Sequence, residues 1–208
     1  MATLNTGKAL ALALGLCTSL YAHGAAINLT TPGSEYGGGQ YTLGFEFTVS
    51  SNRTITSLGV YDSGANGLSS NAQIGIWDTS GNLLTSTTIL AGTGQLDGLF
   101  RYVNISGFSL VAGTHYVIGA YTTDLASSLN TLQGGSGSID PDVDVIVDRY
   151  SAFNSIFSFP TQTDGHADGA WLGANFRTGA TGSVPEPASL ALIALGLLGI
   201  GAARQRKS

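Results

Sequence analysis

The sequence predicts an all-β domain, a β-sandwich or jelly roll of about eight or nine strands. Short runs alternate apolar and polar residues, which places one set on each face of a strand. Glycine, serine, threonine and asparagine fill the gaps between the runs, and the 208 residues include 30 glycines. No central stretch keeps a helical period over three turns. Many short strands separated by turn residues are typical of sandwiches and jelly rolls.

The expected strands follow one another with short connections. In chain order they cover 41–49, 55–61, 73–77, 83–89, 99–105, 108–110, 115–121, 142–150 and 171–177. The first strand alternates strictly and should be half-buried. Residues 78–82 predict a hairpin in which Gly81 supplies a positive φ. Segments 122–138 and 151–169 are expected to be long surface loops.

Charge and cysteine content limit the function classes. Residues 26–182 hold four arginines and twelve carboxylates, a net charge of −8. Such a surface repels phosphates and excludes nucleic acid as a partner. The one cysteine, Cys17, lies in the N-terminal apolar run. The domain that follows would therefore contain no disulfide.

Residues 1–25 are predicted to form a signal peptide with a helical apolar core. Lys8 supplies the positive region, residues 9–16 are apolar, and small residues follow near Ala22. The apolar run is too short to span a bilayer. The predicted order is signal peptide 1–25, β-sandwich domain 26–178, linker 179–183 and a distinct tail 184–208.

The tail joins three features in a fixed order. It begins with Val184, Pro185, Glu186 and Pro187. An uncharged apolar run, 188–203, follows and would extend roughly 24 Å as a transmembrane helix, against about 30 Å of hydrocarbon. Arg204, Arg206 and Lys207 then form a basic stop that should stay in the cytoplasm.

This combination resembles the PEP-CTERM sorting signal of bacterial exported proteins. The resemblance implies an exosortase as partner, transient insertion in the inner membrane, cleavage near the motif and transfer to the cell surface or extracellular space. Such proteins typically occur in bacteria that make extracellular polysaccharide. The alternative is a plain single-span anchor.

The central region is similar to a domain of unknown function often found ahead of this signal. The similarity covers about 26–177 and implies a β-sandwich without a known activity. The segments that carry it are 55–62, 74–78, 80–81, 100–103, 112–119 and 172–176.

Four aspartates suggest a metal site. Asp140, Asp142, Asp144 and Asp148 recur at even spacing, so on a strand they would share a face. Calcium prefers oxygen ligands, but the spacing of a calcium loop is absent. The alternative is a solvated strand edge whose charges deter aggregation.

Two further sets are candidates for chemistry. Asp164, His166 and Asp168 resemble a hydrolase site, although turn aspartates beside glycines are usually structural. Trp77 and Trp171 suggest stacking on sugar rings, although most aromatic residues belong to the core.

We therefore expect a non-catalytic exported protein of the surface or extracellular matrix, sorted by an exosortase and associated with exopolysaccharide or biofilm. No cofactor is expected, apart from the calcium suggested by the aspartates. Two alternatives stay open: a carbohydrate-binding module, with or without calcium, and a hydrolase that uses Asp164, His166 and Asp168.

Overall fold

The computed structural model describes residues 24–36, 41–122, 128–130, 136–165 and 173–179. Within these residues the chain forms thirteen strands and one short 3-10 helix, Ser63–Ala65. The strands are β1 (Ile27–Thr31), β2 (Ser34–Tyr36), β3 (Thr42–Val49), β4 (Arg53–Tyr61), β5 (Ala72–Asp78), β6 (Leu83–Ile89), β7 (Gln95–Asp97), β8 (Phe100–Leu110), β9 (Tyr116–Thr122), β10 (Ser128–Asn130), β11 (Ser136–Ile139), β12 (Val143–Tyr150) and β13 (Ala174–Gly179).

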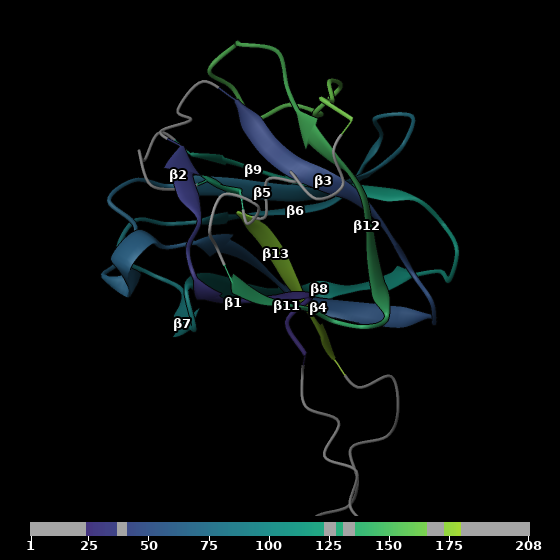
Figure 1. Cartoon of the computed structure of the whole chain (residues 1–208), viewed down its shortest axis with the longest axis horizontal. Helices are drawn as coiled ribbons and strands as arrows, with labels where there is room; N and C mark the ends of the chain where they lie inside the picture. Colours follow the sequence, from purple (N-terminus) through teal and green to yellow (C-terminus); the bar gives the residue numbers. More distant parts are fainter. Residues whose placement is uncertain (1–23, 37–40, 123–127, 131–135, 166–172, 180–208) are drawn as a thin grey trace, which may run out of the picture.

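The strands build a β-sandwich (Figure 1), so the predicted fold class is confirmed. One sheet has the order β12-β3-β9-β5-β6 and the other β13-β4-β8-β7, with antiparallel neighbours throughout. The nine strands of these two sheets match the predicted number. Two short antiparallel pairs, β1-β11 and β10-β2, lie outside them.

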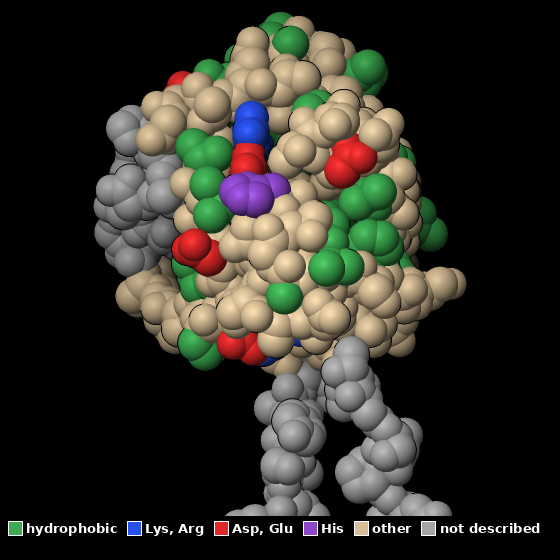
Figure 2. All heavy atoms as spheres, turned by 90° about the vertical axis from the view of Figure 1, so that its right-hand side faces the viewer, with side chains coloured by type: hydrophobic (Ala, Val, Ile, Leu, Met, Phe, Trp, Pro, Cys, Tyr) green, Lys and Arg blue, Asp and Glu red, His purple; other side chains and the backbone are tan. Residues whose placement is uncertain are grey.

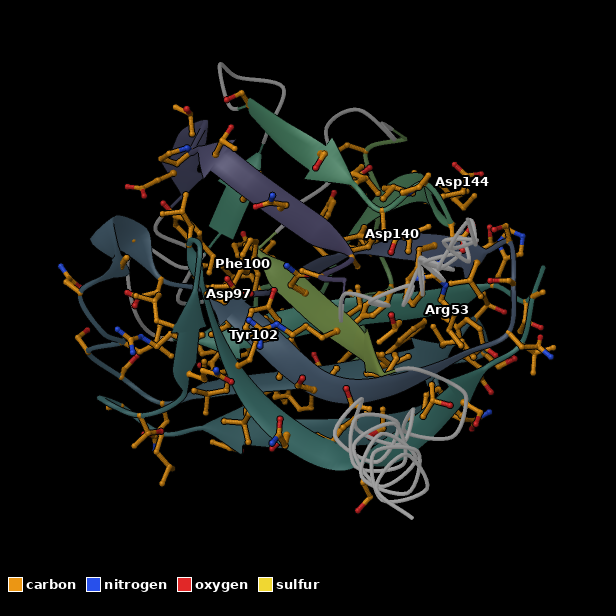
Figure 3. All side chains as sticks on the ribbon, turned by 90° about the horizontal axis from the view of Figure 1, so that it is seen from below. Arg53, Asp97, Phe100, Tyr102, Asp140 and Asp144 are labelled. Carbon is orange, nitrogen blue, oxygen red and sulfur yellow. The ribbon has the colours of Figure 1, made fainter. Side chains whose placement is uncertain are left out.

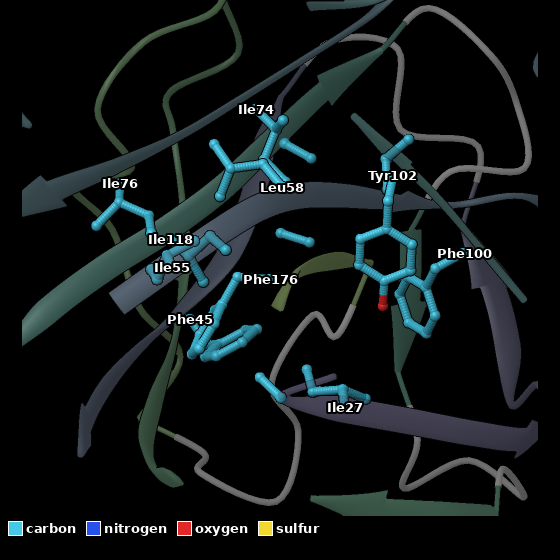
Figure 4. Packing of buried hydrophobic residues seen from close by; sticks show 14 of the residues in the cluster. Ile27, Phe45, Ile55, Leu58, Ile74, Ile76, Phe100, Tyr102, Ile118 and Phe176 are labelled. Atoms are coloured by element: carbon cyan, nitrogen blue, oxygen red, sulfur yellow. The ribbon is translucent and has the colours of Figure 1, made fainter. Parts of the chain in front are cut away.

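The core fills the space between the two sheets (Figure 4). Phe45 and Phe47 of β3, Ile55 and Leu58 of β4 and Phe176 of β13 are all fully buried. The rings of Phe47 and Phe176 lie 5.1 Å apart, which joins the two sheets directly. Each such side chain stabilises the fold by about 1.5–3 kcal/mol, so the core supports the domain without a disulfide.

A row of glycines crosses the outer face of the five-stranded sheet. Gly44 of β3 lies opposite Gly119 of β9, which lies opposite Gly75 of β5. A Cβ added to Gly75 would meet Phe157 at 2.9 Å, and one added to Gly119 would meet Pro160 at 3.5 Å. The missing side chains therefore leave room for residues 151–165, which we call the covering loop.

Hydrogen bonds fix the covering loop to β3. The amide of Thr42 donates to Ser151 Oγ at 2.8 Å, and the amide of Ser158 donates to Thr42 Oγ1 at 3.1 Å. Tyr121 Oη donates to the carbonyl of Ser155 at 2.6 Å. β3 is buried on nearly all of both faces, since the loop covers Thr42 while His115 and Arg149 contact Glu46. The expectation of a half-buried strand is wrong.

The other differences concern strand boundaries. Segments 99–105 and 108–110 belong to one long strand, β8, whose pairing with β4 shifts register between Ile55 and Ser57. The expected loop 122–138 contains β10 and part of β11. The sequence also gave no indication of β1, β2 and β7, which are short and rich in polar residues.

Both ends of the described chain leave the sandwich together (Figure 1). Ala25 forms an isolated bridge with Arg177, and the amide of Ala26 donates to the carbonyl of Phe176 at 2.9 Å. We call this the exit end. No helix among the described residues is long and apolar enough to cross a membrane. Residues 1–23 of the predicted signal peptide, the motif 184–187, the run 188–203 and the basic stop all lie outside the described residues. The last two residues of the predicted signal peptide, Gly24 and Ala25, are described and pair with β13.

Candidate functional site

A cavity of about 430 Å³ opens near the exit end. Figure 3 views this end and shows Asp97, Phe100 and Tyr102 grouped together, with Asp140 further along. The cavity brings apolar, aromatic, amide and carboxylate side chains into one hollow. Its lining residues are Gly24, Ala25, Ile27, Asn28, Asp97, Phe100, Tyr102, Ser138, Ile139, Asp140 and Pro141.

A polar network supports the aromatic wall of this cavity. The guanidinium of Arg177 lies 3.8 Å from the ring centroid of Tyr102 and also pairs with Asp97. Asn175 Nδ2 donates to Tyr102 Oη at 2.8 Å and to the carbonyl of Ile27 at 2.7 Å. Burial raises the pKa of Tyr102 above its ordinary value, so its hydroxyl stays neutral. The aromatic wall therefore presents a neutral hydroxyl that Asn175 and Arg177 hold in position.

Two of the four aspartates expected to bind metal are paired with an arginine. Arg53 donates to Asp140 Oδ2 at 2.9 Å and also bonds Asp142. Ser50 Oγ donates to Asp142 Oδ1 at 2.8 Å. Hydrogen bonds from Ser50 and Arg53 hold the pKa of Asp142 below its usual value. These carboxylates tie the β3–β4 connection to the start of β12.

The other two aspartates lie apart from this pair and from each other. Asp144 is exposed and lies opposite Thr48, whereas Asp148 is 1% exposed and lies opposite Phe45. A register shift between Val145 and Val147 changes the alternation, so the two side chains leave opposite faces. Asp148 accepts hydrogen bonds from Thr163 Oγ1 at 3.0 Å and the Asp164 amide at 2.9 Å.

The four aspartates thus do not share one face as the even spacing predicted. Among the residues that the structure describes, no group of three or more potential metal-ligating side chains occurs.

Trp77 does not present its ring to solvent. It lies on the outer face of β5, but the covering loop leaves it only 3% exposed. Its ring centroid is 5.0 Å from that of Phe157 and 6.1 Å from that of Phe159. The ring is therefore closed to the sugar stacking that the sequence suggested. The second candidate, Trp171, lies outside the described residues.

The proposed hydrolase residues are described only in part. Asp164 is exposed and accepts a hydrogen bond from Tyr150 Oη at 2.9 Å. His166 and Asp168 lie outside the described residues.

An exposed aromatic group whose members the sequence did not bring together lies at the start of the covering loop. The ring of Tyr41 contacts those of Phe153 and Tyr150 edge-on, at centroid distances of 5.5 Å and 6.4 Å. Phe153 is 68% exposed. We call Tyr41, Tyr150 and Phe153 the aromatic surface. In the sequence, the feature that could have pointed to this surface was Phe153, a large apolar residue within the expected loop 151–169.

A charged cluster lies on the outer face of the five-stranded sheet. Glu46 Oε1 lies 2.7 Å from His115 Nδ1, and Oε2 pairs with Arg149. Figure 2 shows the histidine beside an acidic and a basic side chain on this face. Burial opposes ionisation of Glu46, but the hydrogen bonds and charges of Arg149 and His115 outweigh it and lower its pKa.

Comparison with known proteins gives two family matches. Residues 29–171 match a domain of unknown function, DUF4082, and residues 183–207 match the PEP-CTERM protein-sorting motif. Neither a curated protein nor a solved structure matches the chain significantly. The sorting motif implies export, transient anchoring and exosortase processing at the membrane, followed by display at the cell surface or extracellular release. The chain therefore belongs to the DUF4082 family of domains of unknown function and carries a PEP-CTERM motif for exosortase sorting.

Proposed function

We propose that the domain is a non-catalytic component of the cell surface or extracellular matrix that binds extracellular polysaccharide. The aromatic surface supports this proposal most directly. Phe153 is 68% exposed although it is a large apolar side chain. Its ring packs edge-on against Tyr41, and Tyr41 in turn contacts Tyr150. Binding sites for small polar ligands combine such apolar bodies with a few polar groups. Asp164, bonded to Tyr150, supplies one of them.

The position of the aromatic surface suits a tethered protein. Residues 1–25 act in this proposal as the signal peptide for export, and the sorting motif follows the domain. β12 ends and β3 begins at the end of the sandwich away from the exit end (Figure 1). A domain attached through its C-terminal side would therefore point the aromatic surface away from the attachment point.

The roles of the carboxylates favour a non-catalytic domain. Arginines pair with Asp62, Asp97, Asp140, Asp142 and Glu46. An arginine beside a carboxylate favours its ionised form, which makes that carboxylate a poor general acid at neutral pH. These contacts account for most of the acidic residues that the structure describes near the cavity and the outer face.

Co-sedimentation of the purified full-length protein with insoluble polysaccharides tests the proposal. The panel should include cellulose, chitin and the extracellular polysaccharide of the producing cells. Phe153→Ala should weaken binding at least about tenfold, since truncation of a central aromatic anchor costs more than about 1.4 kcal/mol. Val111→Ala, at a residue that is 53% exposed elsewhere on the domain, is the matched control and should bind normally.

Three other outcomes are informative. Failure to bind any polysaccharide, with or without a chelator, would overturn the proposal. Loss of binding with Asp97→Asn but not Phe153→Ala would move the site to the cavity. Loss of polysaccharide binding when a chelator is added would support a calcium-dependent binding module. Release of soluble sugar by the original protein, but not by His166→Ala, would support the hydrolase.

A further inference from the structure

β6 is an edge strand of the five-stranded sheet, and no strand among the described residues pairs with its outer side. Its neighbour in the sheet is β5, and β6 is the last strand in the order. The strand reads LLTSTTI and contains no charge and no proline. An edge of this kind presents backbone N–H and C=O groups that can pair with another strand.

The other long edges carry protection that β6 lacks. β12, at the opposite edge of the same sheet, contains Asp144, Asp148 and Arg149. In the second sheet, the segment that precedes β1 borders the edge strand β13, where the amide of Ala26 donates to the carbonyl of Phe176 at 2.9 Å. The remaining edge strand, β7, has only three residues. Charge, cover and short length are the usual ways in which proteins prevent edge pairing.

Exposed leucines lie at both ends of β6. Leu83 and Leu84 begin β6 and are 49% and 38% exposed, while Leu90 directly follows the strand and is 54% exposed. An antiparallel partner with the same sequence would bring its own Leu90 next to Leu83 and Leu84. Two β6 strands paired antiparallel would therefore place leucines of one copy against leucines of the other. The two-fold symmetry of the pair would repeat this contact at both ends of the strands.

We propose that two copies of this chain pair through β6, antiparallel and with Ser86 at the two-fold axis, so that their five-stranded sheets become continuous. In this register Leu83 lies opposite Ile89 of the second copy. Residues 26–182 carry a net charge of −8, so two copies repel each other where their charged surfaces meet. Contact through the uncharged β6 brings no charged side chain of that strand against its own copy. This inference does not depend on polysaccharide binding.

The proposed register can be tested by disulfide formation. At the axis the two Ser86 Cα atoms would lie about 4.5–5.5 Å apart, within the range that a disulfide bridges. Two Thr88 residues would be offset by four positions along the strands, roughly 13 Å at about 3.3 Å per residue, and could not join. Ser106 is exposed on β8 of the other sheet and is the matched control.

Ser86→Cys, Thr88→Cys and Ser106→Cys should each be made in the full-length chain, since all three keep the same Cys17. Under mild oxidation, Ser86→Cys should give several-fold more covalent dimer on a non-reducing gel than either of the others. Ser86→Lys should reduce the mass measured by light scattering to that of a monomer, with an unchanged circular dichroism spectrum. Equal cross-linking at the three positions would overturn the proposal, and so would a mass that Ser86→Lys leaves unchanged.

Discussion

Glu46 uses both carboxylate oxygens on the outer face of β3, one toward His115 and one toward Arg149. The side chain is 9% exposed, so solvent screens these contacts weakly. The pKa of Glu46 is lower in the folded chain than in a free glutamate. Its ionised form therefore stabilises the fold above the unfolded pKa, about 4.3, and this stabilisation is lost as the pH falls through the folded pKa.

Glu46→Gln should lower the free energy of unfolding by about 2 kcal/mol at pH 7, because it removes hydrogen bonds between charged partners. The difference from the original protein should shrink as the pH falls below the unfolded pKa and through the lower folded pKa, below which the glutamate is protonated in both states. Urea unfolding over a series of pH values from 7 downward measures this. Asp144→Asn, at an exposed carboxylate of the same sheet, should change little. A difference that stayed constant with pH would contradict the assignment.

The sequence predicted the face on which Glu46 lies but not its partners. Alternation along β3 is a local property, and it correctly placed Glu46 on the outer face. His115 and Arg149 are 69 and 103 residues away in the chain, and only the sheet order brings them close. The same applies to Asp140, whose partner Arg53 precedes it by 87 residues. Even spacing alone could not distinguish an ion pair from a metal ligand.

At the scale of elements, the covering loop gives the five-stranded sheet a second small core. Phe157 lies against Trp77 and over the position of Gly75. The glycine row makes this packing feasible, since a side chain on Gly75 would occupy the space of the ring. The loop is therefore part of the stable fold, although its sequence reads as a surface connection.

Phe157→Ala should lower the melting temperature and shift tryptophan emission to longer wavelength, because it uncovers Trp77. We expect a loss of about 2 kcal/mol, less than the 3–5 kcal/mol of a fully buried phenylalanine, since Phe157 is partly exposed. Phe153→Ala, on the same loop but 68% exposed, is the control and should leave both readings unchanged. Equal effects of the two substitutions would show that the loop does not cover Trp77.

Local turn chemistry explains which elements the sequence predicted well. The hairpin at 78–82 forms as expected, with Gly81 at φ 90°. Asp78 Oδ1 accepts from the amides of Ser80 and Asn82, both at 2.9 Å. By contrast, β11 pairs with β1 across more than a hundred residues. Its sequence, SGSI, carries too little apolar pattern to mark a strand.

At the scale of the whole molecule, the sorting motif and the domain should behave as independent units. Pro185→Ala combined with Pro187→Ala should leave the full-length precursor in the membrane fraction, because the prolines hold the motif extended for recognition. Immunoblots of fractionated producing cells measure this. Ser189→Ala, just outside the motif, should be processed normally. Normal processing of the double variant would show that recognition does not require these prolines.

The sequence revealed the tail and the fold class but not the cavity. The tail is contiguous, so residues 184–208 could be recognised directly, and the family match at 183–207 agrees. The cavity combines residues near positions 24–28, 97–102 and 138–141. No pattern within one of these segments indicates the other two. The β1–β11 pairing joins the first segment to the third, and Asn175 links Ile27 to Tyr102 of the second.

The C-terminal strand of the described chain, β13, ends where a force carried by the tail would enter the domain. β13 runs toward the exit end and pairs with β4 over Ala174–Gly179. A force applied through the tail at Gly179, with the far end of the domain held, would act along the axis of β13. Such a force would shear the β13–β4 hydrogen bonds together and would not peel them one by one. The β13–β4 pairing is thus the part of the domain that would bear a load carried by the tail.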